Sequence, residues 1–398
     1  MNSPVGPEKR LKLLRRTEGM VSEDKGLNTL VLEALGIEDE GEDLSLVIDN
    51  PFDPDKIKVT TEKKNIDLIM RRIDHNEVDL APEFQRRARV WHPHRKSQLI
   101  ESLLLRIPLP VFYVAANEKD DWAVVDGLQR LTTIYDFIKD LFPLSGLEYL
   151  SSLEEKTFSQ LDRAMKRRIE ETELVINVIQ PGTPEEVMIN IFKRINTGGT
   201  PLTGQEIRNA LNKGPVRGFL RELAESDDFQ KSTDGRVRDD RMDAQEMVLR
   251  FLAFKITPWT DYKINELDAF LHETMRRLNA MTPSDRAQLG LEFRRAMQTA
   301  RAIFDDNAFR KPRLAGWGRS PVSKPLFEAW SVNLSLLGDG DLRTLLERRS
   351  TVLEKFNKLM VDDPDFVIAI SYSTGVPKRV AKRFGAIQTL IQSIVQGA

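Results

Sequence analysis

The residues best suited to chemistry form a polar turn, Asp126-Gly127-Leu128-Gln129-Arg130, that lies between two apolar segments. The short apolar run before the turn predicts a buried strand, and the apolar stripe after it predicts an amphipathic helix. A strand, a glycine turn and a helix bring backbone N–H groups and the positive end of a helix dipole to one point. The guanidinium of Arg130, in the first helical turn, adds a group that binds phosphate well. This arrangement is typical of an anion site.

Asp126 has two roles that the residues leave open. Aspartate is a preferred N-cap, so Asp126 could simply cap the helix that follows. Its carboxylate could instead hold Arg130, a metal-bound water or a ribose hydroxyl. A capped helix and an anion site therefore have equal weight at this turn.

A second polar segment, residues 82–91, combines arginines with aromatic residues. Its side chains suited to binding are Gln85, Arg86, Arg87, Arg89 and Trp91. Arginine beside an aromatic ring is suited to contacts with phosphates or bases. A solvated arginine cluster is the competing interpretation and has equal weight.

A third polar segment, Asn196-Thr197-Gly198-Gly199-Thr200, lies between two predicted helices. Small polar residues and glycines let a ligand approach the backbone closely, which makes this loop a candidate binding segment. A simple helix–helix corner is the stronger interpretation when the loop is considered alone.

Cap signals mark the two helices that flank this loop. Thr183 with Glu186 forms a capping-box pattern, and Pro184 occupies the first helical position. Thr203 with Glu206 forms a second capping box at the start of the next helix. The loop is therefore expected between two well-defined helices.

The remaining patterns divide the chain into a mixed first half and a helical second half. Periodicity predicts helices at 66–73, 96–104 and 161–169, and strands at 78–80, 111–115, 122–125 and 174–179. After residue 215 only helical patterns occur, at 216–225, 243–254, 264–278, 285–304, 324–336, 342–359 and 380–395. We expect an α+β fold with a flexible arm over 1–57, a mixed domain over 58–214 and an all-α domain over 215–398.

Composition excludes several classes of function. The chain has 398 residues, no Cys, a formal net charge of −2 and a pI of about 6.2. The lack of cysteine excludes disulfides, thiol catalysis and cysteine-based zinc sites, and it suits a reducing cytoplasm. A broad basic surface is not expected, although a local basic groove is compatible with this charge. No apolar run is long enough to span a bilayer and no signal-peptide pattern is present, so we expect a cytoplasmic protein.

The histidines do not predict a metal site. They are His75, His92, His94 and His272. Pro93 prevents His92 and His94 from taking a metal-binding spacing on one helix, and no carboxylate cluster completes a shell, so surface positions are expected for this pair. The chain also lacks a Walker phosphate loop and a GxSxG elbow.

An ordered series of motifs resembles the DUF262 family, the N-terminal domain of GmrSD-type modification-dependent restriction enzymes. The series is PEFQRRARVW, KSQLIESLLLRIPLP, VVDGLQRLTTIYDF and IFKRINTGGTPLTGQEIRNAL, and the resemblance extends over about residues 66–255. Several dissimilar motifs in the family's order and spacing make the resemblance specific.

The resemblance implies a ParB/sulfiredoxin-like core and a nucleotide site. The family's Asp-Gly-Gln-Gln-Arg turn is linked to nucleotide binding and hydrolysis in defence against phage DNA. By this resemblance Asp126, Gln129 and Arg130 would be catalytic. The nucleotide would be bound by Arg86, Gly127, Asn196, Thr197 and Gly198. The implied cofactor is a nucleoside triphosphate (NTP) with Mg²⁺, without a metal site made by the protein alone.

The chain departs from the family in two places. Leu128 replaces the first Gln of the signature, and because Leu128 also lies on the apolar stripe of the predicted helix it can point into the core. If the missing amide contacts nucleotide or water in the family, hydrolysis is affected here. Fused family members carry a C-terminal HNH nuclease domain, whereas the helical half here has no His-rich nuclease motif. We therefore expect that any nuclease partner is a separate protein.

Two functions are compatible with these observations. The first is a nucleotide-binding, NTP-hydrolysing component of a DNA restriction or anti-phage defence system. In it, Arg130 and Arg86 hold phosphates, and their charge supplies the electrostatic stabilisation that phosphoryl transfer needs. Asp126 binds Mg²⁺ through water or orients Arg130, and Gln129 positions the attacking water. On this hypothesis Arg130→Ala abolishes nucleotide binding without unfolding the protein.

The second function is a non-enzymatic DNA-binding or regulatory module with a ParB-like fold. The arginines of residues 82–91 would then follow a DNA backbone, and binding would depend on salt but not on Arg130. The near-neutral net charge argues mildly against this hypothesis.

Overall fold

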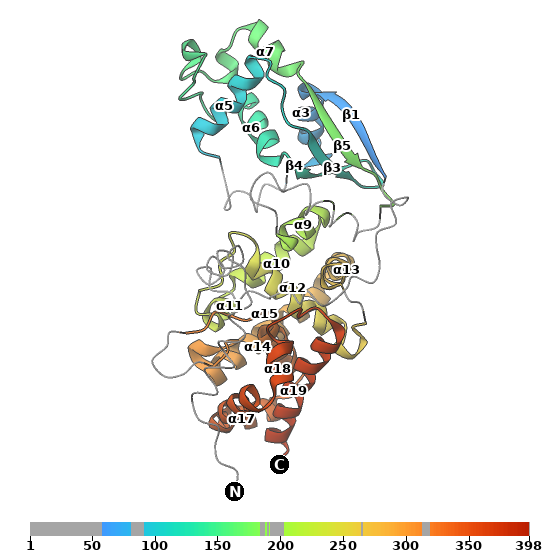
Figure 1. Cartoon of the computed structure of the whole chain (residues 1–398), viewed down its shortest axis with the longest axis vertical. Helices are drawn as coiled ribbons and strands as arrows, with labels where there is room; N and C mark the ends of the chain where they lie inside the picture. The colour runs from blue at the N-terminus through green and yellow to red at the C-terminus, as the bar shows by residue number, and fades with distance from the viewer. Residues whose placement is uncertain are drawn as a thin grey trace.

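The computed structural model describes residues 58–80, 91–183, 188, 191, 203–263, 266–312 and 319–397. The predicted arm over 1–57 lies outside the described residues. Within them, the chain forms an N-terminal lobe around a five-stranded sheet and a helical lobe, with the short helix α9 between the two (Figure 1). The fold is therefore mixed α+β at the N-terminal end and helical beyond it.

The sheet is mixed, with strand order β1-β5-β3-β4-β2. Its strands are β1 (Val59–Asn65), β2 (Val78–Asp79), β3 (Phe112–Ala116), β4 (Trp122–Asp126) and β5 (Glu173–Ile179). β3 pairs antiparallel with β4 and parallel with β5, β1 pairs antiparallel with β5, and β2 pairs parallel with β4. The predicted pairing of the β3 and β4 segments is confirmed.

Strand β1 was not predicted by the sequence patterns. Its residues, VTTEKKN, are mostly polar and mostly exposed. It lies at one edge of the sheet, where main-chain hydrogen bonds to β5 hold it without a buried apolar face. The alternation that reveals a half-buried strand is therefore absent from its sequence.

Four helices of the N-terminal lobe share one apolar core with the sheet (Figure 1). They are α3 (Ile66–Asp74), α5 (Pro93–Leu104), α6 (Leu128–Ile138) and α7 (Arg163–Glu170), with 3₁₀ turns at Ser151–Leu153 and Phe158–Gln160. Asn65 caps α3 by accepting from the amide of Leu68, and Asp162 caps α7 by accepting from the amide of Met165. The helices predicted at 66–73, 96–104 and 161–169 are confirmed.

The other face of the sheet packs against α9 (Gly204–Leu211). Ile207 of α9 is fully buried among Ala115, Val125 and Ile179, which come from three neighbouring strands. The predicted capping box of α9 is confirmed. The Thr203 hydroxyl accepts from the Glu206 amide at 3.1 Å, and the Thr203 amide donates to the Glu206 carboxylate at 2.7 Å.

The helical lobe is built around a large core of its own. Its helices are α10 (Pro215–Glu225), α11 (Asp227–Ser232), α12 (Asp243–Ile256), α13 (Leu267–Ala280), α14 (Pro283–Phe304), α15 (Lys324–Ser335), α16 (Asp339–Glu347), α17 (Arg349–Asp362), α18 (Pro364–Ala369) and α19 (Pro377–Val395), with 3₁₀ turns at Trp259–Asp261 and Asp305–Asn307. An isolated bridge joins Arg310 to Val322. Among the described residues, no helix combines the length and the apolar character needed to cross a membrane.

One helical prediction in this lobe was wrong. The pattern at 342–359 suggested a single helix, but α16 ends and α17 begins on either side of Arg348. The Arg348 guanidinium donates to the carbonyl of Ile394 at 2.7 Å, so this residue is tied to the end of α19. The apolar spacing continues through the break, which is why periodicity alone did not reveal it.

Candidate functional site

The turn between β4 and α6 begins with a β-bulge. Tyr113 pairs with Asp126, whereas the next residue, Val114, pairs with Val124, so β4 carries one extra residue at its end. A bulge bends a strand and redirects its side chains, and such irregularities are common beside active sites. The bulge therefore sets the direction in which Asp126 leaves the sheet.

Gly127 follows the bulge in a conformation that requires glycine. Its φ is +93°, in the left-handed region. A Cβ atom at this position would lie 2.3 Å from the ring of Phe112, which is closer than atoms can approach. The backbone at Gly127 therefore lies directly against the aromatic ring of β3.

Asp126 and Arg130 form an ion pair across this turn. Nη2 of Arg130 lies 2.9 Å from Oδ2 of Asp126, and the two side chains are 11% and 35% exposed, respectively. Arg130 also donates to the carbonyl of Val111 at 3.2 Å and to the carbonyl of Pro110. Its guanidinium carbon lies 4.3 Å from the centre of the Phe112 ring. Arg130 thus joins the start of α6 to the segment that enters β3.

The environment of Arg130 fixes both its charge and its orientation. Burial lowers the pKa of Arg130, and the neighbouring carboxylate of Asp126 opposes that effect. Because the unperturbed pKa of arginine is so high, the side chain keeps its positive charge at neutral pH. The turn therefore contains a fixed cation that is shielded from water on most sides.

The prediction that Asp126 could cap α6 was wrong. The N-cap of α6 is Gly127, which has no side chain that could accept a hydrogen bond from the first turn of this helix. By contrast, α3, α7 and α9 are each capped by a side chain. An uncapped helix start presents backbone amides and a positive partial charge, which is the arrangement that accepts an anion.

The next two residues of the turn have different surroundings. Leu128 is 7% exposed and belongs to the core of the N-terminal lobe, so the interpretation that it points inward is confirmed. Gln129 is half-buried, at the second helical position. Position 128 therefore contributes packing, and Gln129 is the side-chain amide that this turn offers.

The structure brings together only part of the predicted site. Asp126, Gly127, Gln129 and Arg130 share the β4–α6 turn. Arg86, Asn196, Thr197 and Gly198 lie outside the described residues, as do Gln85, Arg87 and Arg89. Trp91 is half-buried against the N-terminal core, and the guanidinium of Arg95 lies 4.4 Å from its ring centre, so its ring is already covered on one side.

Sequence reasoning missed the residues that hold Arg130. Pro110 and Val111 act through their backbone carbonyls, which every residue type has, so no sequence pattern indicates them. Phe112 was expected only as part of a strand, yet its ring contacts both Gly127 and Arg130.

Metal binding by protein groups alone is not supported in the described part of the chain. No group of three or more His, Asp or Glu side chains there could hold an ion. His92 and His94 are exposed, as expected, whereas His272 is buried beside Asn212. Asp126 is the carboxylate of the β4–α6 turn. A Mg²⁺ ion at this turn would therefore need phosphate oxygens and water to complete its shell.

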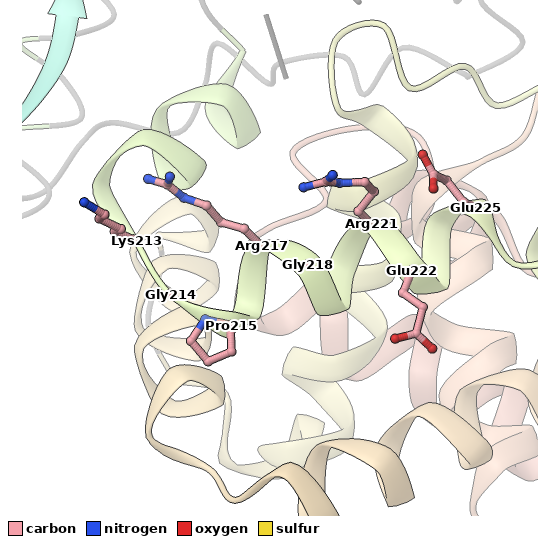
Figure 2. A pocket seen from close by; sticks show the side chains of 8 residues that line it. All are labelled: Lys213, Gly214, Pro215, Arg217, Gly218, Arg221, Glu222 and Glu225. Atoms are coloured by element: carbon pink, nitrogen blue, oxygen red, sulfur yellow. The ribbon is translucent and has the colours of Figure 1, made fainter. Parts of the chain in front are cut away.

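A second candidate site is an open groove along α10 of about 590 Å³. It is lined by Lys213, Gly214, Pro215, Arg217, Gly218, Arg221, Glu222 and Glu225 (Figure 2). Arg217 pairs with Asp79 at 2.8 Å, and Glu222 pairs with Arg294 at 2.7 Å. Since these charges are balanced within the protein, the groove is a weaker anion site than the β4–α6 turn.

Part of the chain matches a known protein family. Residues 66–212 match the family described as "GmrSD restriction endonuclease, N-terminal domain". The match starts at the first residue of α3, includes the β4–α6 turn and ends at the residue after α9. It ends earlier than the predicted limit near residue 255. No curated protein matches the chain.

Proposed function

We propose that this chain is a nucleotide-binding component of a restriction or anti-phage defence system, and that the β4–α6 turn is its nucleotide site. The proposal includes a ParB/sulfiredoxin-like fold for the N-terminal lobe. One observation carries it: a helix start with a glycine N-cap lies behind a bulged strand end, beside a half-buried arginine, within the region that matches the restriction-enzyme domain. This combination places the positive end of a helix dipole beside an ion pair that holds the turn.

The backbone of the first turn of α6 is proposed to hold phosphate oxygens. The N-cap of this helix is Gly127, which has no side chain to offer to the amides of Leu128, Gln129 and Arg130. Arg86, Asn196, Thr197 and Gly198 are proposed to line the same site. Mg²⁺ bound to the phosphates would neutralise part of their charge.

Arg130 is better suited to positioning than to direct phosphate binding. Its donors are directed to Asp126 and to the carbonyls of Pro110 and Val111. We therefore assign Arg130 to holding the turn, with Asp126 orienting it. Gln129 is proposed to orient the attacking water, because phosphoryl transfer depends mainly on positioning and electrostatic stabilisation.

The test uses a variant that should prevent phosphate binding without damaging the fold. Gln129→Glu places a negative charge at the second position of α6, where it stabilises the helix dipole but repels phosphate. Ser284→Glu is the matched control, because Ser284 is exposed at the second position of α14. Binding of ATP and GTP with Mg²⁺ by the full chain should be lost in Gln129→Glu and kept in Ser284→Glu.

The same experiment distinguishes the alternative function. A folded wild type that binds neither ATP nor GTP with Mg²⁺ contradicts the proposed nucleotide site. Salt-dependent DNA binding by that same protein would instead support a DNA-binding or regulatory module. If nucleotide binds but is not hydrolysed by the chain alone, addition of DNA is the next condition, because a defence component is expected to respond to it. A separate nuclease subunit is the further proposed partner.

A further inference from the structure

Helix α9 contacts the candidate site through the sheet. Its Ile207 is fully buried against Val125, and Val125 directly precedes Asp126. Ala115 and Ile179 complete this small apolar cluster on the face of the sheet opposite the main core of the lobe. A shift of α9 would therefore press on the strand end that positions the Asp126–Arg130 turn.

The polar side of the same helix is held by the helical lobe. Arg208, whose side chain is 1% exposed, lies 2.9 Å from Glu246 of α12 and 2.5 Å from Asp268 of α13. Glu206 lies 2.9 Å from Arg241, just before α12. Charged contacts with this degree of burial are costly to break, because a lost partner leaves an uncompensated buried charge. α9 must therefore follow movements of α12 and α13.

The carboxyl end of α9 is tied to both lobes. Arg217 of α10 donates to the carbonyl of Asn209 at 2.8 Å and to that of Asn212 at 3.1 Å. The same guanidinium lies 2.8 Å from the carboxylate of Asp79, at the end of β2. Figure 2 shows Arg217 projecting from the first turns of α10 toward the side on which Lys213 lies. Lys213 donates to the carbonyl of Asn76 at 3.2 Å.

We infer that α9 is a coupling element that links the conformation of the β4–α6 turn to the helical lobe. A helix of eight residues is too short to be stable by itself, so its position is determined by these two sets of contacts. An event in the helical lobe then alters the turn, and binding at the turn alters the helical lobe to the same extent. That the ligand at the turn is a nucleotide rests on the proposed function, whereas the coupling through the contacts of α9 does not.

The first test needs no ligand. Asp268→Asn removes one charged partner of Arg208 at a side chain that is 39% exposed, so the fold should tolerate it. Amide hydrogen exchange should become about fivefold faster, or more, at residues 131–134 in the full-length chain, because these are the first amides of α6 that donate to a backbone carbonyl. Amides of α5 serve as the internal reference, because α5 packs in the main N-terminal core and thus reports global unfolding.

Glu273→Gln is the matched control on the same helix. Glu273 is 56% exposed and pairs with Arg276 of its own helix, so exchange at residues 131–134 should not change. In an Ile207→Ala background, Asp268→Asn should lose its effect on those amides, since the apolar link is removed. Ile207→Val replaces Ile207→Ala if the alanine variant fails to fold. Faster exchange in α13 without a change at residues 131–134 would overturn the inference.

The second test adds ATP with Mg²⁺ to the wild type. Slower exchange in α9 and α13, together with the turn, is the result expected from coupling. Protection confined to the turn would contradict the coupling while supporting the nucleotide site. Failure to bind nucleotide contradicts the proposed function, and the ligand-free test then still decides whether α9 couples the two lobes.

Discussion

The carboxylate of Asp126 lies 2.9 Å from the guanidinium of Arg130, so the two principal charges of the β4–α6 turn compensate each other. An ion pair of this kind has little net attraction for a phosphate. The attraction in the proposed site must therefore come from the positive end of the α6 dipole and from a further cation, for which Arg86 is the candidate. The pair instead fixes the geometry of the turn.

Replacing Arg130 by alanine should therefore destabilise the protein. The change leaves Asp126 and the carbonyl of Val111 without a donor, and we expect the free energy of unfolding to fall by about 2–3 kcal/mol. Arg163→Ala is the control, because its pair with Glu170 involves a side chain that is 72% exposed and should contribute under about 1 kcal/mol. Urea unfolding followed by circular dichroism measures both. Equal losses in the two variants would show that Arg130 does not support the turn.

The structural role of Arg130 changes how a nucleotide-binding experiment on Arg130→Ala is interpreted. The sequence suggested that Arg130→Ala would abolish nucleotide binding in an intact fold. Given its contacts, loss of binding in that variant also reflects damage to the turn. Arg130→Lys keeps the charge but loses the forked geometry, so it separates the two effects.

Two glycine substitutions should change stability in opposite directions. Gly127→Ala forces a left-handed conformation and a clash with Phe112, and we expect a loss of about 2–4 kcal/mol. Gly218→Ala, on an open face of α10, meets no atom within 4 Å and should gain about 0.5–1 kcal/mol from helix propensity. Thermal unfolding of the two variants beside the wild type is sufficient. A stable Gly127→Ala protein would mean that the turn is not as tight as the contact with Phe112 indicates.

The sequence predicted the elements that carry a strong apolar pattern. Helices α3 and α5 and the pair β3–β4 were located correctly, because each buries one face and the burial leaves a period in the sequence. Strand β1 was missed, because an edge strand is held by backbone hydrogen bonds that have no residue signature. The break at Arg348 was also missed because a backbone group is involved: the Arg348 guanidinium donates to a carbonyl of α19, and a carbonyl has no residue signature.

At the candidate site, the sequence indicated that Asp126 and Arg130 could pair but did not decide between pairing and capping. Asp126 and Arg130 are four positions apart at a helix start, so their pairing was one of the alternatives considered. The choice between pairing and capping depended on the positive φ of Gly127, which made glycine the N-cap. The link from Val125 through Ile207 to the helical lobe joins residues far apart in the sequence, and no local pattern could indicate it.

The stability of the helical lobe should decrease in acid because of Glu246. Burial by itself raises the pKa of this carboxyl, but Lys324, Arg250 and Arg208 outweigh that effect and hold the pKa well below the usual 4.5. A lowered pKa in the folded state stabilises the protein above the unfolded value, and that stability is lost as pH falls below about 4.5. The free energy of unfolding should drop by up to about 1.4 kcal/mol per pH unit for this group.

Glu246→Gln provides the check on this pH dependence. At neutral pH it should cost about 3–5 kcal/mol, because three cations lose their shared partner. Below about pH 4.5 the variant should lose less stability per pH unit than the wild type, by the contribution of one proton. Urea titrations at a series of pH values measure both slopes. Parallel slopes would assign the acid sensitivity to other groups.

The role of Asp126 is decided by Asp126→Asn. If Asp126 only orients Arg130, the amide keeps a hydrogen bond to the guanidinium, and removal of the negative charge leaves Arg130 more attractive to phosphate. We therefore expect nucleotide binding that is as tight as in the wild type or up to about tenfold tighter, both with Mg²⁺ and with EDTA. If Asp126 instead holds Mg²⁺ through water, affinity falls in Mg²⁺ and is unchanged in EDTA. Titration calorimetry under the two conditions separates these outcomes, and a loss seen only with Mg²⁺ would assign Asp126 to the metal.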